Sequence, residues 1–255
     1  MTNIILNGAC GKMGRVITKI VSERDDCKIT AGVDKAPVKY ADFEVYDSIS
    51  KVTEPADVII DFSHPSALSD VLGYAVDKQI GAVIATTGLD EQHIAMVNDA
   101  AKKTAVFFTY NMSLGVNLLA SLAKKASYVL GDSFDIEIIE AHHNQKIDAP
   151  SGTALMLADA VEEPKKGTDD SYYYEFDRHS RREKRNKREI GIHAIRGGNI
   201  VGEHTVMFAG HDEIITLSHS ARSKEVFAVG AVNAAVFISG KVAGLYNMSD
   251  LVANR

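Results

Sequence analysis

The sequence predicts an α/β protein, with a doubly wound, parallel-sheet (Rossmann-like) nucleotide domain and a second α+β domain that contains a mixed sheet. Two observations predict it. In residues 1–112, short apolar strands alternate with helical segments, the order that produces a parallel sheet covered by helices. In residues 190–218, three strand-like segments follow one another through glycine turns, which favours antiparallel pairing in a second sheet.

The composition is that of an ordinary globular protein. The chain has 255 residues, 45% of them hydrophobic and 24% charged, enough for one large domain or two smaller ones. Its net charge of -6 argues against broad affinity for nucleic acid or acidic membranes. The longest apolar run, residues 226–238, is interrupted by Asn233 and is too short to cross a bilayer. We therefore expect neither a nucleic-acid partner nor a membrane partner.

The two cysteines and the first residues indicate the compartment. Cys10 and Cys27 do not make a disulfide framework. The chain starts with a strand-like run and not with the pattern of a signal peptide. We expect a reduced, cytoplasmic protein.

The first strand, residues 4–7, leads into a glycine-rich turn. Gly8, Gly11 and Gly14 follow the strand and precede a helix over residues 15–21. In this context glycines let the backbone approach a pyrophosphate at the helix N-terminus. The spacing G-x-x-G-x-x-G departs from the commoner G-x-G-x-x-G, and the alternative is a plain tight turn. The dinucleotide interpretation is favoured because the next strand supports it.

That second strand, residues 29–33, ends at Asp34, about twenty residues beyond the turn. An acidic side chain there accepts hydrogen bonds from ribose hydroxyls and repels a 2′-phosphate. Lys35 acts in the opposite direction, because a cation could bind that phosphate. We expect NADH as the first cofactor, with NADPH tolerated.

Three further strands complete the predicted parallel sheet. In such sheets ligands lie beyond the carboxyl ends of the strands, which places Thr86, Thr87 and Asn111 near the cofactor. The alternative is ordinary turn chemistry, since these are turn residues anyway. The strands are predicted at residues 57–63, 82–85 and 105–108, with helices at 66–79 and at 90–103, the latter capped by Asp90.

The second half contains the stretch richest in chemistry, residues 140–154. An amphipathic helix over residues 115–130 links the two domains, and a strand from Phe134 leads to His142 and His143. Residues 150–153 then precede a helix that runs to about Val161, and a capped helix start of this kind attracts anions.

Residues 178–188 contain seven Lys or Arg. A nucleic-acid patch is one interpretation, but the aromatic residues precede the run and do not interleave with it, so a mobile, solvated loop is favoured. A loop so charged could also close over an anionic ligand. A helix over residues 225–242 completes the chain.

Together these motifs resemble the 4-hydroxy-tetrahydrodipicolinate reductase family, also called dihydrodipicolinate reductase, of lysine and diaminopimelate biosynthesis. The resemblance covers nearly the whole chain and lacks a match only over residues 162–188. It rests on residues 8–14, 61–63, 86–88, 111–117, 140–154, 201–205 and 227–231.

The resemblance implies an NAD(P)H-dependent oxidoreductase that converts 4-hydroxy-tetrahydrodipicolinate to tetrahydrodipicolinate with loss of water. It implies a nucleotide domain of residues 1–112 and 221–255, and a substrate domain of residues 113–220 that forms a homotetramer, with hinge closure between them. The substrate is a small ring dicarboxylate.

The resemblance also implies roles for individual residues. His142 and Lys146 are the catalytic pair, and the substrate carboxylates meet His143, Lys146, Ser151, Gly152 and Thr153. Ala85 and Met112 depart from the family, which often has Gly and an aromatic residue there. The cofactor contacts are Gly8, Ala9, Cys10, Gly11, Lys12, Met13, Asp34, Ala85, Thr86, Thr87, Thr109, Tyr110, Asn111 and Met112.

The chemistry suits these residue types. Hydride delivered to an unsaturated ring conjugated with an imine leaves electron density that a proton must quench. Lys146 holds a charge at neutral pH, and a histidine titrates near the working pH and can relay the proton. Adjacent strand residues point to opposite faces, so only one of the two histidines easily faces a given ligand. The resemblance implies proton handling for His142 and a carboxylate contact for His143. Asp148 is expected to be a loop or capping residue, and no metal site is expected.

The remaining histidines on or between the predicted strands, His193, His204, His211 and His219, are expected to be structural. Two rival functions remain. One is a dehydrogenase that oxidises an amine, which would share the glycine turn but not Lys146 followed by Ser-Gly-Thr. The other is a nicotinamide sensor that binds a partner through residues 178–188.

Overall fold

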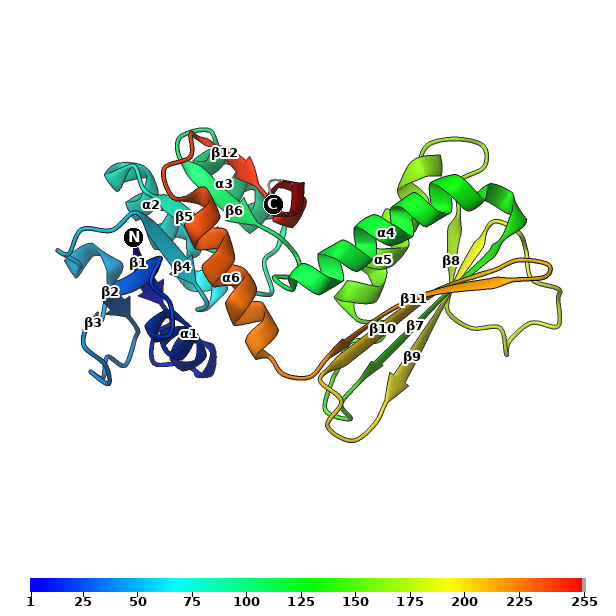
Figure 1. Ribbon diagram of the computed structural model, residues 1–255, viewed down its shortest axis with the longest axis horizontal. Coiled ribbons are helices and arrows are strands. Elements are labelled where there is room, and N and C mark those ends of the chain that lie inside the picture. The colour runs from blue at the N-terminus through cyan, green and yellow to red at the C-terminus, as the bar shows by residue number, and fades with distance from the viewer. Residues whose placement is uncertain (254–255) are drawn as a thin grey trace. The chain divides into compact units, whose positions relative to one another are not determined.

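A computed structural model describes residues 1–253 of the chain (Figure 1). The chain forms two compact units, one made of Met1–Leu114 together with the chain from Glu225 onward, the other of Gly115–Lys224. The sequence placed the domain boundaries at 112/113 and 220/221. No helix in the described part is both long and apolar enough to cross a membrane.

The first unit contains a parallel sheet with the strand order β12-β6-β5-β4-β1-β2-β3. The order reverses beside β1, which pairs with β2 on one side and β4 on the other, so the predicted doubly wound sheet is confirmed. The strands are β1 (Thr2–Asn7), β2 (Cys27–Val33), β3 (Glu44–Tyr46), β4 (Val58–Asp61), β5 (Gly81–Ile84), β6 (Ala105–Phe108) and β12 (Gly244–Tyr246).

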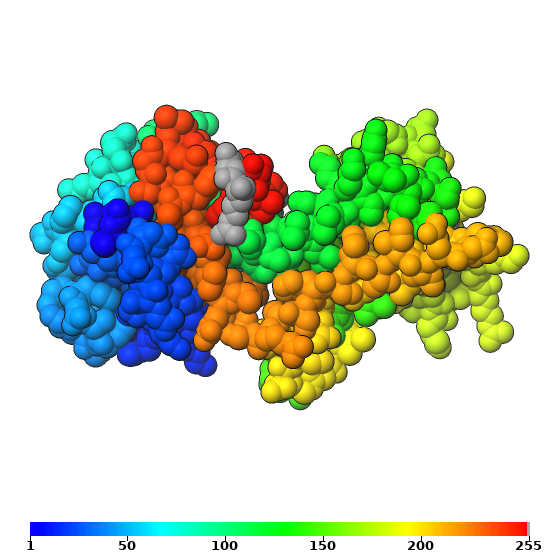
Figure 2. Space-filling view, viewed as in Figure 1, coloured from blue at the N-terminus to red at the C-terminus, as the bar shows by residue number. Residues whose placement is uncertain are grey.

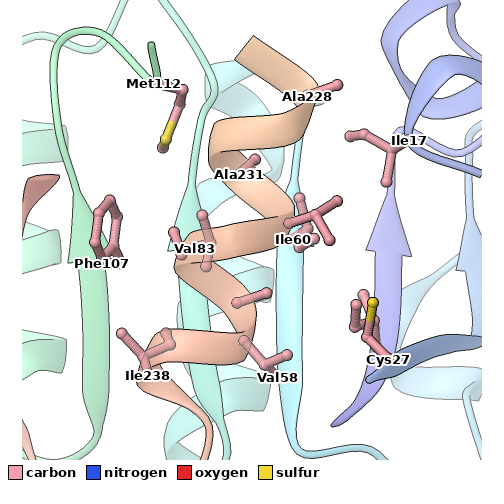
Figure 3. Close-up of a cluster of buried hydrophobic side chains, with 14 of the residues drawn as sticks. Ile17, Cys27, Val58, Ile60, Val83, Phe107, Met112, Ala228, Ala231 and Ile238 are labelled. Carbon is pink, nitrogen blue, oxygen red and sulfur yellow. The ribbon is translucent and has the colours of Figure 1, made fainter. Parts of the chain in front are cut away.

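Helices cover both faces of this sheet. On one face α1 (Lys12–Ser22), α6 (Glu225–Ile238) and α7 (Met248–Ala253) contribute to one apolar cluster, and on the other α2 (Leu68–Lys78) and α3 (Glu91–Ala101) contribute to a second. Figure 3 shows Ala228, Ala231 and Ile238 of α6 over the central strands. Small residues let α6 lie close to the sheet, and each isoleucine buried there contributes about 1.5–3 kcal/mol.

Local sequence explains where these elements begin. The central strand β4 is buried throughout, and its first three residues, Val58 to Ile60, are an apolar run, as expected for a strand covered on both faces. Asp90 caps α3 as predicted, because its carboxylate accepts the N–H of His93 at 3.0 Å. Short 3-10 turns lie at η1 (Ile49–Lys51), η2 (Pro65–Ala67), η3 (Gly131–Ser133) and η4 (Glu163–Lys165).

The last helix of the sequence prediction was too long. Helix α6 ends at Ile238, not at residue 242, because the chain turns at Gly240, whose φ of +75° favours glycine. The strand β12 and helix α7 that follow were not predicted, nor were β3 and β8. Three-residue strands carry too little alternation to be recognised.

The second unit contains a mixed sheet with the order β11-β10-β7-β9-β8, which confirms the predicted second sheet. One face packs against α4 (Leu114–Leu130) and α5 (Gly152–Glu162). Alternate residues of β11 are exposed, and the β10–β11 hairpin lies on the surface visible in Figure 2. The strands are β7 (Asp135–His142), β8 (Tyr173–Glu175), β9 (Glu189–Arg196), β10 (Gly202–Ala209) and β11 (Ile214–Ala221).

The expected antiparallel pairing of three consecutive strands was wrong for the first pair. Strand β7 lies between β9 and β10, parallel to β9 and antiparallel to β10. Of the three predicted strands, now β9, β10 and β11, only β10 and β11 pair with each other. The Gly197-Gly198 turn crosses the end of β7 instead of closing a hairpin. Gly197 N donates to His142 O at 3.0 Å, and Asn144 N donates to Gly198 O at 3.2 Å.

Candidate active site

The glycine turn of the first unit requires glycine for steric reasons. Gly8 has a φ of +81°, and a Cβ there would overlap the carbonyl group of Phe62. A Cβ at Gly14 would overlap the carbonyl oxygens of Gly8 and Ala9. The turn is therefore packed against the end of β4 and against its own helix.

The helix that follows this turn is open to an anion. Gly11 is the N-cap of α1 and offers no side-chain cap, and no acidic residue stands in the first turn. Uncapped N–H groups and the helix dipole favour a pyrophosphate, and the cation of Lys12 at the first helical position adds to this preference. The residues present fit a dinucleotide cofactor.

Asp34 is held against the glycine turn. Its Oδ2 accepts the N–H of Cys10 at 2.9 Å, and its Oδ1 accepts the N–H of Ala36 at 3.2 Å. A carboxylate fixed beside the turn can also accept hydrogen bonds from ribose hydroxyls. The position agrees with the role expected for Asp34.

A cavity of about 450 Å³ opens beside these residues. Gly8, Gly11, Asp34 and Lys35 line it, together with residues that the sequence did not indicate, such as Ile49 and His64. The apolar side chain of Ile49 and the polar rim suit the adenosine part of a cofactor. These residues come from loops whose sequence has no motif, so no signal could have identified them.

Thr86 lies at the end of β5, where its hydroxyl group makes hydrogen bonds within the protein. It donates to Asp61 Oδ2 at 2.7 Å and accepts the N–H of Ser63 at 3.1 Å. Asp61, fully buried, also accepts from Asn7 at 2.8 Å and from Ser63 at 2.5 Å. Burial raises the pKa of Asp61, and these hydrogen bonds offset only part of the rise. The carboxylate ties together the ends of β1, β4 and β5.

The other predicted cofactor residues follow β5 and β6. Tyr110 is exposed, whereas Met112 is buried in the cluster under α6. A Cβ at Gly230 of α6 would overlap the carbonyl group of Met112, so this loop lies close against the helix. The side chains of Thr109 and Asn111 form hydrogen bonds within the loop. Ala85 is half-buried, and Thr87 is exposed.

In the second unit, one buried carboxylate connects the exit of β7 to the start of α5. Glu140 has no exposed side-chain surface. It accepts His142 Nδ1 at 2.6 Å and the N–H of Ser151 at 2.9 Å. Arg196 of β9 binds both of its oxygens, at 2.7 and 2.8 Å. The structure thus brings His142 and the helix start together through a residue that the sequence analysis did not select.

A second connection runs through His204, which was expected to be only structural. Its Nε2 lies 3.1 Å from Ser151 Oγ, and its ring centroid lies 5.1 Å from that of His142. Burial, with a smaller contribution from neighbouring His142, lowers the pKa of His204 to about 4, so this ring is neutral at pH 7. His204 is therefore part of the surroundings of His142.

Ser151 caps α5, and its neighbours are more open. Its hydroxyl oxygen accepts the N–H of Ala154 at 3.2 Å, and only 1% of the residue is exposed. Gly152 is exposed, and a Cβ there would meet nothing within 4 Å. Thr153 is half-buried. An anion would therefore approach α5 most easily at Gly152 and Thr153.

Lys146 and His143 occupy the loop between β7 and α5. The ammonium nitrogen of Lys146 lies 2.8 Å from Asp148 Oδ1, and its backbone N–H donates to the His143 carbonyl oxygen at 3.1 Å. This ion pair, together with backbone N–H groups, lowers the pKa of Asp148. His143 is half-buried, so it stands at the surface of the same loop.

The basic segment at residues 178–188 is not simply a solvated loop. Arg178 binds Glu137 at 2.7 Å and Glu189 at 2.6 Å, and Arg181 binds Glu189 at 2.6 Å. Arg185 binds Glu137 at 3.0 Å. Glu189 directly follows the segment on β9, whereas Glu137 on β7 lies 41 positions from Arg178 in sequence, a distance at which the sequence gives no sign of the pairing. Because Arg178, Arg181 and Arg185 are already paired with glutamates, fewer cations are available for phosphates, and the nucleic-acid interpretation is weakened.

Family models match almost the whole chain. The model for the N-terminal part of dihydrodipicolinate reductase matches residues 2–112, and the model for its C-terminal part matches residues 115–252. The chain belongs to the dihydrodipicolinate reductase family. The resemblance expected from the sequence motifs is confirmed.

Relatives in the dihydrodipicolinate reductase family are similar along their full length. A 4-hydroxy-tetrahydrodipicolinate reductase of Caldanaerobacter subterraneus subsp. tengcongensis is 50% identical over 99% of this chain and 98% of its own. Another, of Clostridium tetani, is 46% identical over 99% and 97%. A solved dipicolinate-bound dihydrodipicolinate reductase from Paenisporosarcina sp. TG-14 has a TM-score of 0.79 at 24% identity, covering 97% of each chain, and confirms the fold.

Proposed function

We propose that the chain is a 4-hydroxy-tetrahydrodipicolinate reductase of the diaminopimelate route to lysine. It reduces 4-hydroxy-tetrahydrodipicolinate to tetrahydrodipicolinate, taking up a hydride and a proton and releasing water. Full-length similarity to relatives with this activity supports the reaction. The assignment of residues rests on one observation. The carboxylate of Glu140 accepts hydrogen bonds both from His142 and from the N–H of Ser151 at the anion-binding start of α5.

The cofactor is NADH or NADPH, and the first unit binds it. The turn from Gly8 to Met13 and the N-terminus of α1 would hold the pyrophosphate, and Asp34 would hold the ribose. When bound, the nicotinamide supplies the hydride. Asp34 is already fixed by two backbone N–H groups, and its negative charge favours NADH over NADPH.

The second unit binds a ring dicarboxylate. The start of α5, at the exposed Gly152 and the half-buried Thr153, presents N–H groups to one carboxylate. The ammonium group of Lys146 and the imidazole of His143 can donate hydrogen bonds to the carboxylates of the same substrate. Ser151 positions the first turn of the helix, because its hydroxyl oxygen caps the N–H of Ala154.

His142 handles the proton in this account. Its side chain is 11% exposed and held at Nδ1 by Glu140, so the ring is oriented before substrate binds. Lys146 stabilises the negative charge that develops when the ring accepts the hydride, and His142 passes the proton that quenches it. Both groups lie on the 140–154 stretch.

We also propose that the enzyme is a cytoplasmic homotetramer that associates through its substrate domain. The support is the face of the second sheet opposite α4 and α5. Ile195 and Ile214 on this face are 52% and 64% exposed, and association of subunits through this face would bury them. Sedimentation of the purified protein would test the subunit count.

A coupled assay tests the function. Purified protein is mixed with NADH and with 4-hydroxy-tetrahydrodipicolinate generated enzymatically in the cuvette, and loss of reduced nicotinamide is followed. The expected result is NADH oxidation that depends on both substrate and protein. Oxidation of an amine with NAD⁺, and no reduction of the ring, would instead support the amine dehydrogenase.

A further inference from the structure

The carboxylate of Glu140 is saturated with donors. Oε1 accepts the N–H of Ser151 and one Arg196 nitrogen, and Oε2 accepts His142 Nδ1 and the other Arg196 nitrogen. A fully buried carboxylate with a bidentate arginine and two further donors is strongly fixed in place. The carboxylate therefore also holds the His142 ring, the Ser151 N–H group and the Arg196 guanidinium in place.

This arrangement decides which nitrogen of His142 carries hydrogen. Burial alone would raise the pKa of Glu140, but the hydrogen bonds from Arg196, His142 and Ser151 outweigh it and lower that pKa. An ionised carboxylate only accepts hydrogen bonds, so Nδ1 of His142 must donate. Nε2 is then the nitrogen that gains and loses a proton.

Nε2 of His142 lies close to the backbone of Gly202 on β10. A Cβ at Gly202 would lie only 3.1 Å from Nε2, so glycine keeps this side of the ring clear. His204 packs edge-on against the ring from β10. Glu140 therefore binds Nδ1 of the imidazole, and Nε2 faces the backbone of Gly202, which has no side chain.

We propose that Glu140 and Arg196 are a positioning pair for the proton transfer by His142. Glu140 keeps the hydrogen of the neutral ring on Nδ1, so that Nε2 exchanges the proton with the substrate. Arg196 balances the charge of Glu140, so that the carboxylate orients the imidazole without holding it permanently as an imidazolium. The proposal rests on the proposed catalytic role of His142.

The other titratable groups near this ring contribute little charge at neutral pH. Burial lowers the pKa of both His204 and His219, so both are neutral. Lys146 is paired with Asp148, and these opposite charges largely cancel. Arg196 also donates to the Asp148 carbonyl oxygen at 2.7 Å, which fixes its position. The balance of charge around the His142 imidazole is therefore determined mainly by Glu140 and Arg196.

Two substitutions should move the pH profile of kcat in opposite directions. Glu140→Gln keeps a carbonyl acceptor for Nδ1 but removes the negative charge, so the alkaline limb should move to lower pH. Arg196→Met leaves the carboxylate unbalanced, which stabilises the imidazolium, so this limb should move to higher pH. Each shift should be roughly one pH unit. Combining the two substitutions should bring the limb back toward the wild-type position.

A matched control separates charge balance from loss of packing. Glu189 is also a fully buried glutamate on a strand of this sheet and is bound by Arg178 and Arg181. Glu189→Gln should reduce stability to a similar extent and leave the alkaline limb in place. Thermal unfolding and NADH affinity of each variant report folding separately from catalysis.

The outcomes distinguish this proposal from the proposed function. If His142→Ala keeps normal turnover, the assignment of His142 fails, and the positioning pair loses its purpose. If His142→Ala is inactive but both charge variants move the limb the same way, or not at all, the positioning pair is refuted while the function stands. Nitrogen NMR of the wild-type histidines requires no variant, and a neutral His142 with hydrogen on Nε2 would also overturn the proposal.

Discussion

The ammonium group of Lys146 lies 2.8 Å from the carboxylate of Asp148, within the loop that joins β7 to α5. Asp148 has a 58% exposed side chain, while that of Lys146 is 21% exposed. The cation proposed to bind the substrate is therefore already paired with a carboxylate of its own loop. A substrate carboxylate would have to compete with Asp148 for Lys146.

Replacing Asp148 by Asn should strengthen substrate binding. An exposed ion pair contributes about 0.2–1 kcal/mol, so the KM of the ring substrate should fall by up to about fivefold with kcat little changed. Steady-state kinetics at saturating NADH measure this. Asp170→Asn, which removes the exposed partner of Arg188, serves as the control and should leave KM unchanged. A KM that is unchanged or higher in Asp148→Asn would rule out the competition.

Lys146→Ala and His142→Ala should each reduce turnover strongly. Loss of a positioned proton donor or of its charge partner costs roughly 10²–10⁴-fold in rate. NADH affinity should stay normal because the cofactor residues belong to the other unit. Turnover and NADH titration of each variant provide the test, with Lys125→Ala on the outer part of α4 as the control. Near-normal turnover in both variants would contradict the roles assigned to Lys146 and His142.

Gly202→Ala should impair catalysis through His142 alone. The new Cβ would lie 3.1 Å from Nε2 and would push the ring by a few tenths of an ångström, so kcat should fall roughly tenfold or more. Gly197→Ala is the matched control, because a Cβ there meets nothing within 4 Å. Equal rates for the two variants would show that Nε2 tolerates the displacement.

Asp61 makes the stability of the first unit depend on pH. Its pKa is raised in the folded protein, so its contribution is most favourable below the unfolded pKa and is lost as the pH rises through the folded pKa. The free energy of unfolding of wild type relative to Asp61→Asn should therefore decrease from acid to neutral pH. Urea unfolding at both ends of this range measures the difference. An increase with pH would mean that the hydrogen bonds from Asn7, Ser63 and Thr86 outweigh burial.

Much of the fold could be predicted because its signals are local. The apolar run of β4, the glycine turn before α1 and the cap at Asp90 each depend on neighbours within a few residues. The same holds for the stretch from Glu140 to Ala154, where the candidate residues follow one another in the chain. Short elements such as β12 were missed because three residues carry no periodicity.

The contacts around the candidate residues could not be predicted because they depend on strand register. In the sheet His142 pairs with Arg196 and Glu140 with His204, partners more than fifty positions apart in sequence. That register brings Arg196 to Glu140 and His204 to Ser151. It also explains the basic segment, whose arginines find Glu137 and Glu189 on neighbouring strands. Glu137 lies 41 positions from Arg178, so the charge pattern along the chain does not indicate this pairing.

Transfer of labelled hydride from the nicotinamide to the ring provides a direct test of the proposed reduction. The enzyme is given NADH that carries deuterium on the transferred position of the nicotinamide, together with freshly generated 4-hydroxy-tetrahydrodipicolinate, and the product is analysed by mass spectrometry and NMR. We predict tetrahydrodipicolinate with a single deuterium on ring carbon C4, formed roughly 10²–10⁴-fold more slowly with His142→Ala. Unlabelled product, or consumption of NADH without reduction of the ring, would contradict the account.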